Sequence, residues 1–310
     1  MKKILIAFGG NALLRNGDDS TFDSQLNRAT EAFERISDII LENNVIITHG
    51  NGPQVGNILL QNESSRKVTK SMPLHACGAM SQGLIGEILA EAYDSVKLKK
   101  GILKEASVIM TRTVVDKDDF AFLNPTKPIG PYYDRETADD LMKTRKWQMK
   151  EEGSKGYTRL VPSPVPKDIV ERAAIFNCLN DGFMPICTGG GGIPVVKSER
   201  GYMGVDAVID KDLASSLLAR ILEVDKFVIL TDVKGVYRNY GSPEEEFIPD
   251  ISAFDLEKDL QSGIFPKGSM GPKTLAALEF ARVTGKHAII GSLDEAGKVI
   301  DGKAGTVIHR

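Results

Sequence analysis

Short apolar runs alternate with segments of helical period along almost the whole chain. The apolar runs predict strands at residues 4–8, 45–48, 106–111, 183–188, 226–231, 287–291 and 306–309, the last of them as an edge strand. Apolar side chains at steps of three and four predict helices at residues 26–40, 83–98, 213–221 and 273–282. Strands that alternate with helices indicate an α/β fold, in which helices cover both faces of a largely parallel central sheet.

Residues 113 to about 166 interrupt this alternation, because they are rich in charge, proline, glycine and tyrosine and hold few periodic apolar positions. Long irregular insertions in compact α/β domains are usually either functional lids or disordered segments. Pro125, Pro128, Pro131 and Trp147 favour an ordered structure. The insertion therefore predicts a small protruding subdomain.

The length of 310 residues allows two domains. Residues 197–201 are polar and turn-like, and a new apolar stretch follows them. We therefore predict an N-terminal lobe over residues 1–200, which carries the insertion, and a C-terminal lobe over residues 201–310.

Composition disfavours two classes of partner. Lys and Arg number 39 against 42 for Asp and Glu, so the formal net charge is −3 and the basic excess typical of nucleic-acid-binding proteins is missing. No apolar run approaches the ~18 residues that a membrane span needs. The basic start of the chain precedes an apolar run that is too short for a signal peptide. We expect a cytoplasmic protein with neither nucleic acid nor membrane as a partner.

The cysteines and histidines predict no metal centre. Cys77, Cys178 and Cys187 are odd in number and show no C-x-x-C spacing, and the four histidines are dispersed. Neither a disulfide framework nor a zinc site fits this distribution.

Three predicted strands end in glycine-rich loops. The residues of interest are Gly9, Gly10 and Asn11, then Gly50, Asn51 and Gly52, and finally Gly189, Gly190 and Gly191. In an open α/β sheet, ligands bind at the carboxyl ends of the strands. Glycines there let backbone N–H groups approach a phosphate, and helix N-termini add a favourable dipole. Together the loops predict a phosphate-binding site.

The common phosphate-binding motifs are not the source of this prediction. Any one glycine pair after a strand is more often only a tight turn. Residues 50–56 resemble the dinucleotide fingerprint but hold one residue too many and a proline. No G-x-x-x-x-G-K-[ST] sequence occurs, which excludes a P-loop.

Charged residues stand next to the predicted loops. Lys211 lies between Asp210 and Asp212 directly after an apolar run, and Lys273 follows a glycine loop that opens a helix. Phosphoryl transfer needs cations at such places, because negative charge must be neutralised on the transferring group and the leaving oxygen. The alternative is that an aspartate is only a helix N-cap and that the lysines are surface charges.

Eight motifs in order give the sequence a family resemblance. They lie at residues 7–13, 48–56, 79–83, 123–128, 161–164, 189–194, 207–214 and 267–273. Over nearly its whole length the chain resembles the carbamate kinases of the amino acid kinase superfamily. The element Asn124-Pro125-Thr126-Lys127-Pro128 is similar to one found in carbamate kinase-like members rather than throughout the superfamily.

The resemblance implies a three-layer αβα sandwich with a protruding subdomain, assembled as a homodimer. It implies reversible phosphoryl transfer between ATP and carbamate, which gives ADP and carbamoyl phosphate, with Mg²⁺ bound to the nucleotide. Carbamate is already an anion, so its oxygen needs no general base to attack a phosphate. Positioning and charge stabilisation would then be the main sources of catalysis.

The resemblance also implies roles for individual residues. The loops around Gly9, Gly10, Asn11, Gly50 and Asn51 would bind the transferring phosphate and carbamate. The cationic clamp would be Lys127, Lys211 and Lys273, with Asp210 and Asp212 positioning the lysines and the metal-bound nucleotide. The nucleotide would be bordered by Thr231, Asp232, Val233, Tyr237 and Met270.

Two features of the insertion bear on these roles. Because Lys127 lies outside the βα alternation, we predict that a closing subdomain delivers it to the site. The alternative is a surface ion pair with Asp118 or Asp119. In addition, relatives commonly have Arg-Gly-Tyr/Trp-Arg-Arg where this chain has Lys155-Gly156-Tyr157-Thr158-Arg159, so only the last arginine is kept.

Three competing functions fit parts of the pattern. A kinase for another small carboxylate or phosphate substrate would use the same loops and lysines. A non-catalytic nucleotide sensor is disfavoured, because all three clamp lysines are present. A dinucleotide-dependent dehydrogenase is disfavoured by the extra residue in the loop at 50–56.

Overall fold

The computed structural model describes residues 1–10, 13–14, 19–265 and 270–310. Its centre is an eight-stranded sheet with the strand order β15-β17-β16-β12-β1-β2-β9-β3. The strands are β1 (Lys3–Phe8), β2 (Asn44–His49), β3 (Ala106–Ile109), β9 (Met184–Cys187), β12 (Lys226–Thr231), β15 (Asp250–Ser252), β16 (Ala288–Ser292) and β17 (Thr306–His309). Every neighbouring pair is parallel except β16 and β17, so the predicted largely parallel sheet is confirmed.

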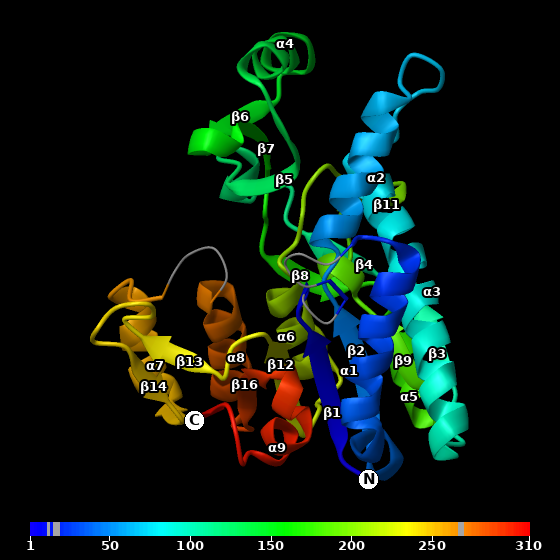
Figure 1. Ribbon diagram of the computed structural model, residues 1–310, viewed down its shortest axis with the longest axis vertical. Coiled ribbons are helices and arrows are strands. Elements are labelled where there is room, and N and C mark those ends of the chain that lie inside the picture. The colour runs from blue at the N-terminus through cyan, green and yellow to red at the C-terminus, as the bar shows by residue number, and fades with distance from the viewer. Residues whose placement is uncertain (11–12, 15–18, 266–269) are drawn as a thin grey trace.

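Helices cover both faces of this sheet (Figure 1). One face carries α1 (Phe22–Glu42), α3 (Leu74–Lys100) and α9 (Ala296–Asp301), and the other carries α5 (Arg172–Asn180), α6 (Lys211–Ile221), α7 (Ala253–Gln261) and α8 (Met270–Thr284). The alternation along β1 explains the two cores: Ile4 and Ile6 pack with α1, whereas Leu5 and Ala7 pack on the opposite side. The predicted three-layer αβα sandwich is confirmed.

Smaller sheets flank the central one. A four-stranded sheet has the order β11-β10-β4-β8, and a two-stranded sheet pairs β13 with β14. Their bounds are β4 (Arg112–Val115), β8 (Pro166–Ile169), β10 (Ile193–Ser198), β11 (Gly201–Gly204), β13 (Val236–Arg238) and β14 (Glu246–Ile248).

The insertion forms a protruding unit, which stands above the main body next to α2 (Gly52–Ser64) in Figure 1. It contains an antiparallel sheet of order β5-β7-β6 and one helix. These elements are β5 (Lys127–Tyr133), α4 (Arg135–Arg145), β6 (Gln148–Glu151) and β7 (Tyr157–Val161). Val55 and Ile58 of α2 share a small apolar core with Ile129 and Val161, so this unit rests on the helix that follows the second glycine loop.

One strand prediction is wrong. The strand at 306–309 does not lie at the edge of the sheet, because β17 sits between β15 and β16 and pairs with both. The short strand β15, which precedes α7, takes the edge instead. Among the described residues, no helix is both long and apolar enough to cross a membrane.

Candidate active site

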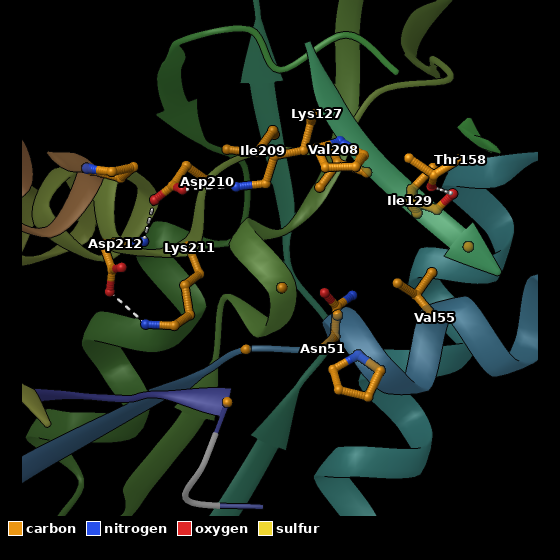
Figure 2. Close-up of a pocket in the computed structure, with 18 of the residues that line it drawn as sticks. Asn51, Val55, Lys127, Ile129, Thr158, Val208, Ile209, Asp210, Lys211 and Asp212 are labelled. Atoms are coloured by element: carbon orange, nitrogen blue, oxygen red, sulfur yellow. Dashed lines mark hydrogen bonds and ion pairs between the residues drawn. The ribbon is translucent and has the colours of Figure 1, made fainter. Parts of the chain in front are cut away.

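A pocket of about 490 Å³ lies where the strands β1, β2 and β9 end, beneath the protruding subdomain (Figure 2). Its charged lining residues come from three elements: Lys127 from β5, Asp210, Lys211 and Asp212 from the start of α6, and Lys273 from the first turn of α8. Its glycine-loop lining consists of Gly10, Gly50, Asn51, Gly52 and Gly190. The fold therefore brings together segments that are far apart in the sequence.

Asp212 holds two of the lysines on one carboxylate. Its Oδ1 lies 2.5 Å from Lys211 Nζ and its Oδ2 lies 3.3 Å from Lys273 Nζ. The side chain of Asp212 is only 3% exposed, and those of Lys211 and Lys273 are 13% and 14% exposed. Burial alone would raise the pKa of Asp212, but the two ammonium groups hold it below its ordinary value. The aspartate is thus ionised and fixes both cations in the pocket.

Asp210 joins helix α6 to the protruding subdomain. Its Oδ1 accepts hydrogen bonds from the backbone N–H groups of Asp212 and Leu213, at 2.9 and 3.4 Å, which makes it the N-cap of the helix. Its Oδ2 lies 3.2 Å from Lys127 Nζ. Asp210 is therefore a helix N-cap, and Lys127 lies beside it in the lining of the pocket. The alternative partner Asp119 instead accepts from the N–H groups of Ala121 and Val165.

His49 is a buried, neutral residue behind the second glycine loop. Its Nδ1 lies 2.9 Å from the Gly50 carbonyl oxygen, to which it donates. Burial, with a smaller contribution from nearby Lys211, lowers the pKa of His49 to about 4 against the raising effect of that hydrogen bond. His49 therefore carries no charge near neutral pH and acts as a support for the loop.

The third glycine loop packs tightly against the second. A Cβ atom on Gly189 would lie 2.4 Å from the imidazole of His49. A Cβ atom on Gly190, which has φ +61°, would lie 2.2 Å from the carboxamide of Asn51. Only glycine allows these approaches, so the loop fixes the positions of His49 and Asn51.

A hydrogen bond to helix α3 also fixes the side chain of Asn51. Its Nδ2 donates to Ser81 Oγ at 2.8 Å, and that hydroxyl donates to the Gly78 carbonyl at 2.6 Å. Ser81 belongs to the motif at 79–83, for which the sequence suggested no role. In the structure Ser81 accepts a hydrogen bond from Asn51 and so helps to fix that residue of the glycine loop.

The predicted site residues divide into three groups. Those that line the pocket are Gly10, Gly50, Asn51, Gly52, Lys127, Gly190, Asp210, Lys211, Asp212 and Lys273. Those described but not among its lining are Gly9, Gly189, Gly191, Thr231, Asp232, Val233, Tyr237 and Met270. Asn11 lies outside the described residues. Gly9 donates to the Leu230 carbonyl at 2.8 Å, so the end of β12 lies directly beside the first glycine loop.

Sequence reasoning missed the apolar wall of the pocket. This wall contains Pro53, Val55, Ile129, Val208 and Ile209, together with the hydroxyl-bearing Thr158. In the sequence, Thr158 differs from the family pattern but carries no predicted role. Its neighbour in that pattern, Lys155, lies on the surface, with Nζ 5.7 Å from the centre of the Tyr132 ring.

The pocket's carboxylates fit a metal that arrives with a nucleotide. Within the described ranges, no three His, Cys, Asp or Glu side chains gather into a metal site. Mg²⁺ is commonly held by one or two carboxylates together with substrate phosphates, and it keeps several waters. Asp210 and Asp212 provide two such carboxylates, each already beside a lysine.

Comparison with known proteins identifies the family. The model of the amino acid kinase family matches residues 2–292. The chain therefore belongs to the amino acid kinase family, and relatives more than 40% identical to it over its full length include several carbamate kinases. The carbamate kinase of Thermoplasma volcanium is 48% identical over 308 residues, which cover 99% of each chain. That of Thermococcus kodakarensis is 44% identical over 314 residues, which cover 100% of each.

Solved structures give the same result. The carbamate kinase from Giardia lamblia bound to AMP-PNP superimposes with a TM-score of 0.95 at 42% identity, covering 99% of this chain and 98% of that chain. The family resemblance found in the sequence motifs is thus confirmed.

Proposed function

We propose that this chain transfers a phosphoryl group reversibly between ATP and carbamate, giving ADP and carbamoyl phosphate. The observation that carries the proposal is the pocket in which Lys127, Lys211 and Lys273 converge from three separate elements. Full-length similarity to enzymes named carbamate kinase supports carbamate as the acceptor. A kinase for another small carboxylate would share the lysines but not that similarity.

Charge neutralisation is the proposed source of catalysis. Lys211 and Lys273, fixed by Asp212, would face the phosphate chain and stabilise charge on the transferring group and the leaving oxygen. Lys127 would approach the same phosphate from the subdomain. Because carbamate is already an anion, the reaction needs no general base. His49, the histidine beside the second glycine loop, can therefore be neutral and structural.

The two substrates would bind to different lobes. We assign carbamate and the transferring phosphate to the glycine loops of residues 1–200, and the nucleotide to residues 201–310. Thr231, Asp232, Val233, Tyr237 and Met270 stay a predicted border for the nucleotide. Their nearness to the pocket supports this: Thr231 follows Leu230, which contacts Gly9, and Met270 begins the helix that carries Lys273.

Mg²⁺ is the proposed metal. It would be held chiefly by the nucleotide phosphates, with Asp210 and Asp212 facing it, and it would neutralise part of the phosphate charge. These carboxylates would also hold the three lysines directed into the pocket.

We also propose a homodimer. Strand β3 is at one end of the central sheet, and Val108 on it and Met110 just after it are exposed. Light scattering should give twice the chain mass of 33.7 kDa. A mass of one chain at micromolar concentration would contradict the proposal.

The activity test is ATP formation from ADP and carbamoyl phosphate with purified protein. We expect ATP to appear in the presence of Mg²⁺ and to stop when EDTA is added in excess. A boiled sample is the control. No ATP above that control would refute the proposed reaction.

A further inference from the structure

Thr158 is an unusual residue in the wall of the pocket. It lies on β7, is only 2% exposed, and lines the pocket. Its hydroxyl donates to the Ile129 carbonyl at 3.5 Å, which is the far limit of a hydrogen bond. Within the described part of the chain, no group donates a hydrogen bond to Thr158 Oγ1, so the two lone pairs of this oxygen are available to accept one.

The rest of the pocket offers mainly donors. Lys127, Lys211 and Lys273 carry ammonium groups, and the glycine loops present backbone N–H groups. Its acceptors are the carboxylates of Asp210 and Asp212, each of which already holds a lysine, and the carboxamide oxygen of Asn51 on the glycine-loop side. Thr158 is therefore a neutral acceptor in a pocket otherwise suited to anions.

Thr158 also lies on the side where the acceptor substrate would bind. Figure 2 shows Thr158 and Ile129 across the pocket from Lys211 and Asp212. Val55 and Ile129 make this side apolar, and a hydrogen bond is stronger in such surroundings than in water. If the nucleotide phosphates occupy the side of Lys211 and Lys273, the small substrate faces Thr158.

One group in the proposed substrates needs an acceptor. Phosphate and carboxylate oxygens can only accept hydrogen bonds, whereas the amino group of carbamate and of carbamoyl phosphate can only donate. From this complementarity, which rests on the proposed function, we infer that Thr158 is a specificity-determining residue whose hydroxyl accepts a hydrogen bond from the substrate amino group. It discriminates against acyl groups that carry a methyl in its place.

The test compares two acyl phosphates in two variants. Carbamoyl phosphate carries the amino group, and acetyl phosphate carries a methyl group of similar size. Thr158→Val keeps the shape of the side chain but removes the hydroxyl, whereas Thr158→Ser keeps the hydroxyl. Each protein is assayed with both compounds, and acetyl phosphate is measured as a competitive inhibitor if it is not turned over. Thermal unfolding confirms that each variant is folded.

For Thr158→Val we expect kcat/KM for carbamoyl phosphate to fall by about 5- to 10-fold, mainly through KM, because the amino group does not react. The kcat/KM or the inhibition constant for acetyl phosphate should not change, and neither should the KM for ADP. Thr158→Ser should behave like the parent protein. A loss of the same size for both acyl phosphates, or no loss for carbamoyl phosphate, would overturn the inference. If the parent protein itself makes no ATP from carbamoyl phosphate, the proposed function fails instead.

Discussion

The two groups of charges in the pocket are held in different ways. Lys211, Asp212 and Lys273 form a buried cluster on α6 and α8, which belong to the main body. Lys127 comes from the protruding subdomain, its side chain is 36% exposed, and its ammonium group pairs with Asp210 of the main body. The positions of the buried cluster are fixed by the packing of α6 and α8 in the main body. The position of Lys127 depends instead on how the protruding subdomain packs on that body. The two groups should therefore respond differently to mutation.

The largest effect is expected from the buried cluster. Lys211→Ala and Lys273→Ala should each lower kcat by roughly 10²- to 10³-fold, because each would remove a fixed cation from the transition state. Steady-state ATP formation measures this loss. The exposed Lys298, which pairs with Glu295 on the surface, gives a matched control as Lys298→Ala. Near-normal turnover in either cluster variant would show that the lysine has no part in transfer.

A second prediction concerns the acid stability of the main body. Burial holds the pKa of His49 at about 4, below its ordinary value of 6.5. Between these values the unfolded chain binds the proton and the folded chain does not, so the free energy of unfolding falls as the pH falls through this window. From about pH 7.5 to about pH 5, His49 should account for a loss of about 2 kcal/mol.

Urea unfolding at both pH values measures this dependence. His49→Gln should lose most of it, whereas His287→Gln, which changes an exposed histidine, should keep it. A pH dependence that is the same in the parent protein and in His49→Gln would contradict the assigned burial of a neutral imidazole.

The smallest effect is expected at the far end of the subdomain. Arg145 Nη2 of α4 lies 3.6 Å from Glu63 Oε2 of α2, and the arginine side chain is 39% exposed. Glu63 also pairs with Arg66, so the loss of Arg145 leaves it one partner, and a pair with a half-exposed arginine contributes at most about 1 kcal/mol. Arg145→Ala should change kcat by less than about threefold. At high salt, which screens exposed charges, the kcat of the variant and of the parent protein should be nearly equal. A loss as large as that of a clamp lysine would show that the tip of the subdomain controls its position.

Much of the fold followed from local patterns. Strands β1 and β12 are continuous apolar runs, and burial on both faces of a parallel sheet produces such runs. The sequence predicts a glycine-rich loop over residues 50–56, whereas α2 already begins at Gly52. In the structure Pro53 lies in its first turn, where a proline costs no hydrogen bond. The position of β17 could not be predicted, since strand order depends on long-range packing.

The site was predictable where it rests on strand ends, and less so elsewhere. Glycines and lysines that follow apolar runs meet at one edge of the sheet, as expected for Gly50 and Lys211. The partner of Lys127 is 83 residues away in sequence, and Thr158 lies in a strand of the insertion, which has no βα rhythm to predict its orientation. These contacts arise only when the subdomain is placed on α2.

The most direct test of the central claim is the variant Lys127→Ala, studied by ADP titration calorimetry and by steady-state kinetics in parallel. Lys150→Ala, an exposed lysine of the same subdomain, is the control. If Lys127 acts on the phosphate in transfer while the main body binds the nucleotide, kcat should fall by about 10²-fold and the Kd for ADP should stay within about twofold. An unchanged kcat, or an ADP affinity that falls as far as kcat does, would contradict a clamp completed by the subdomain.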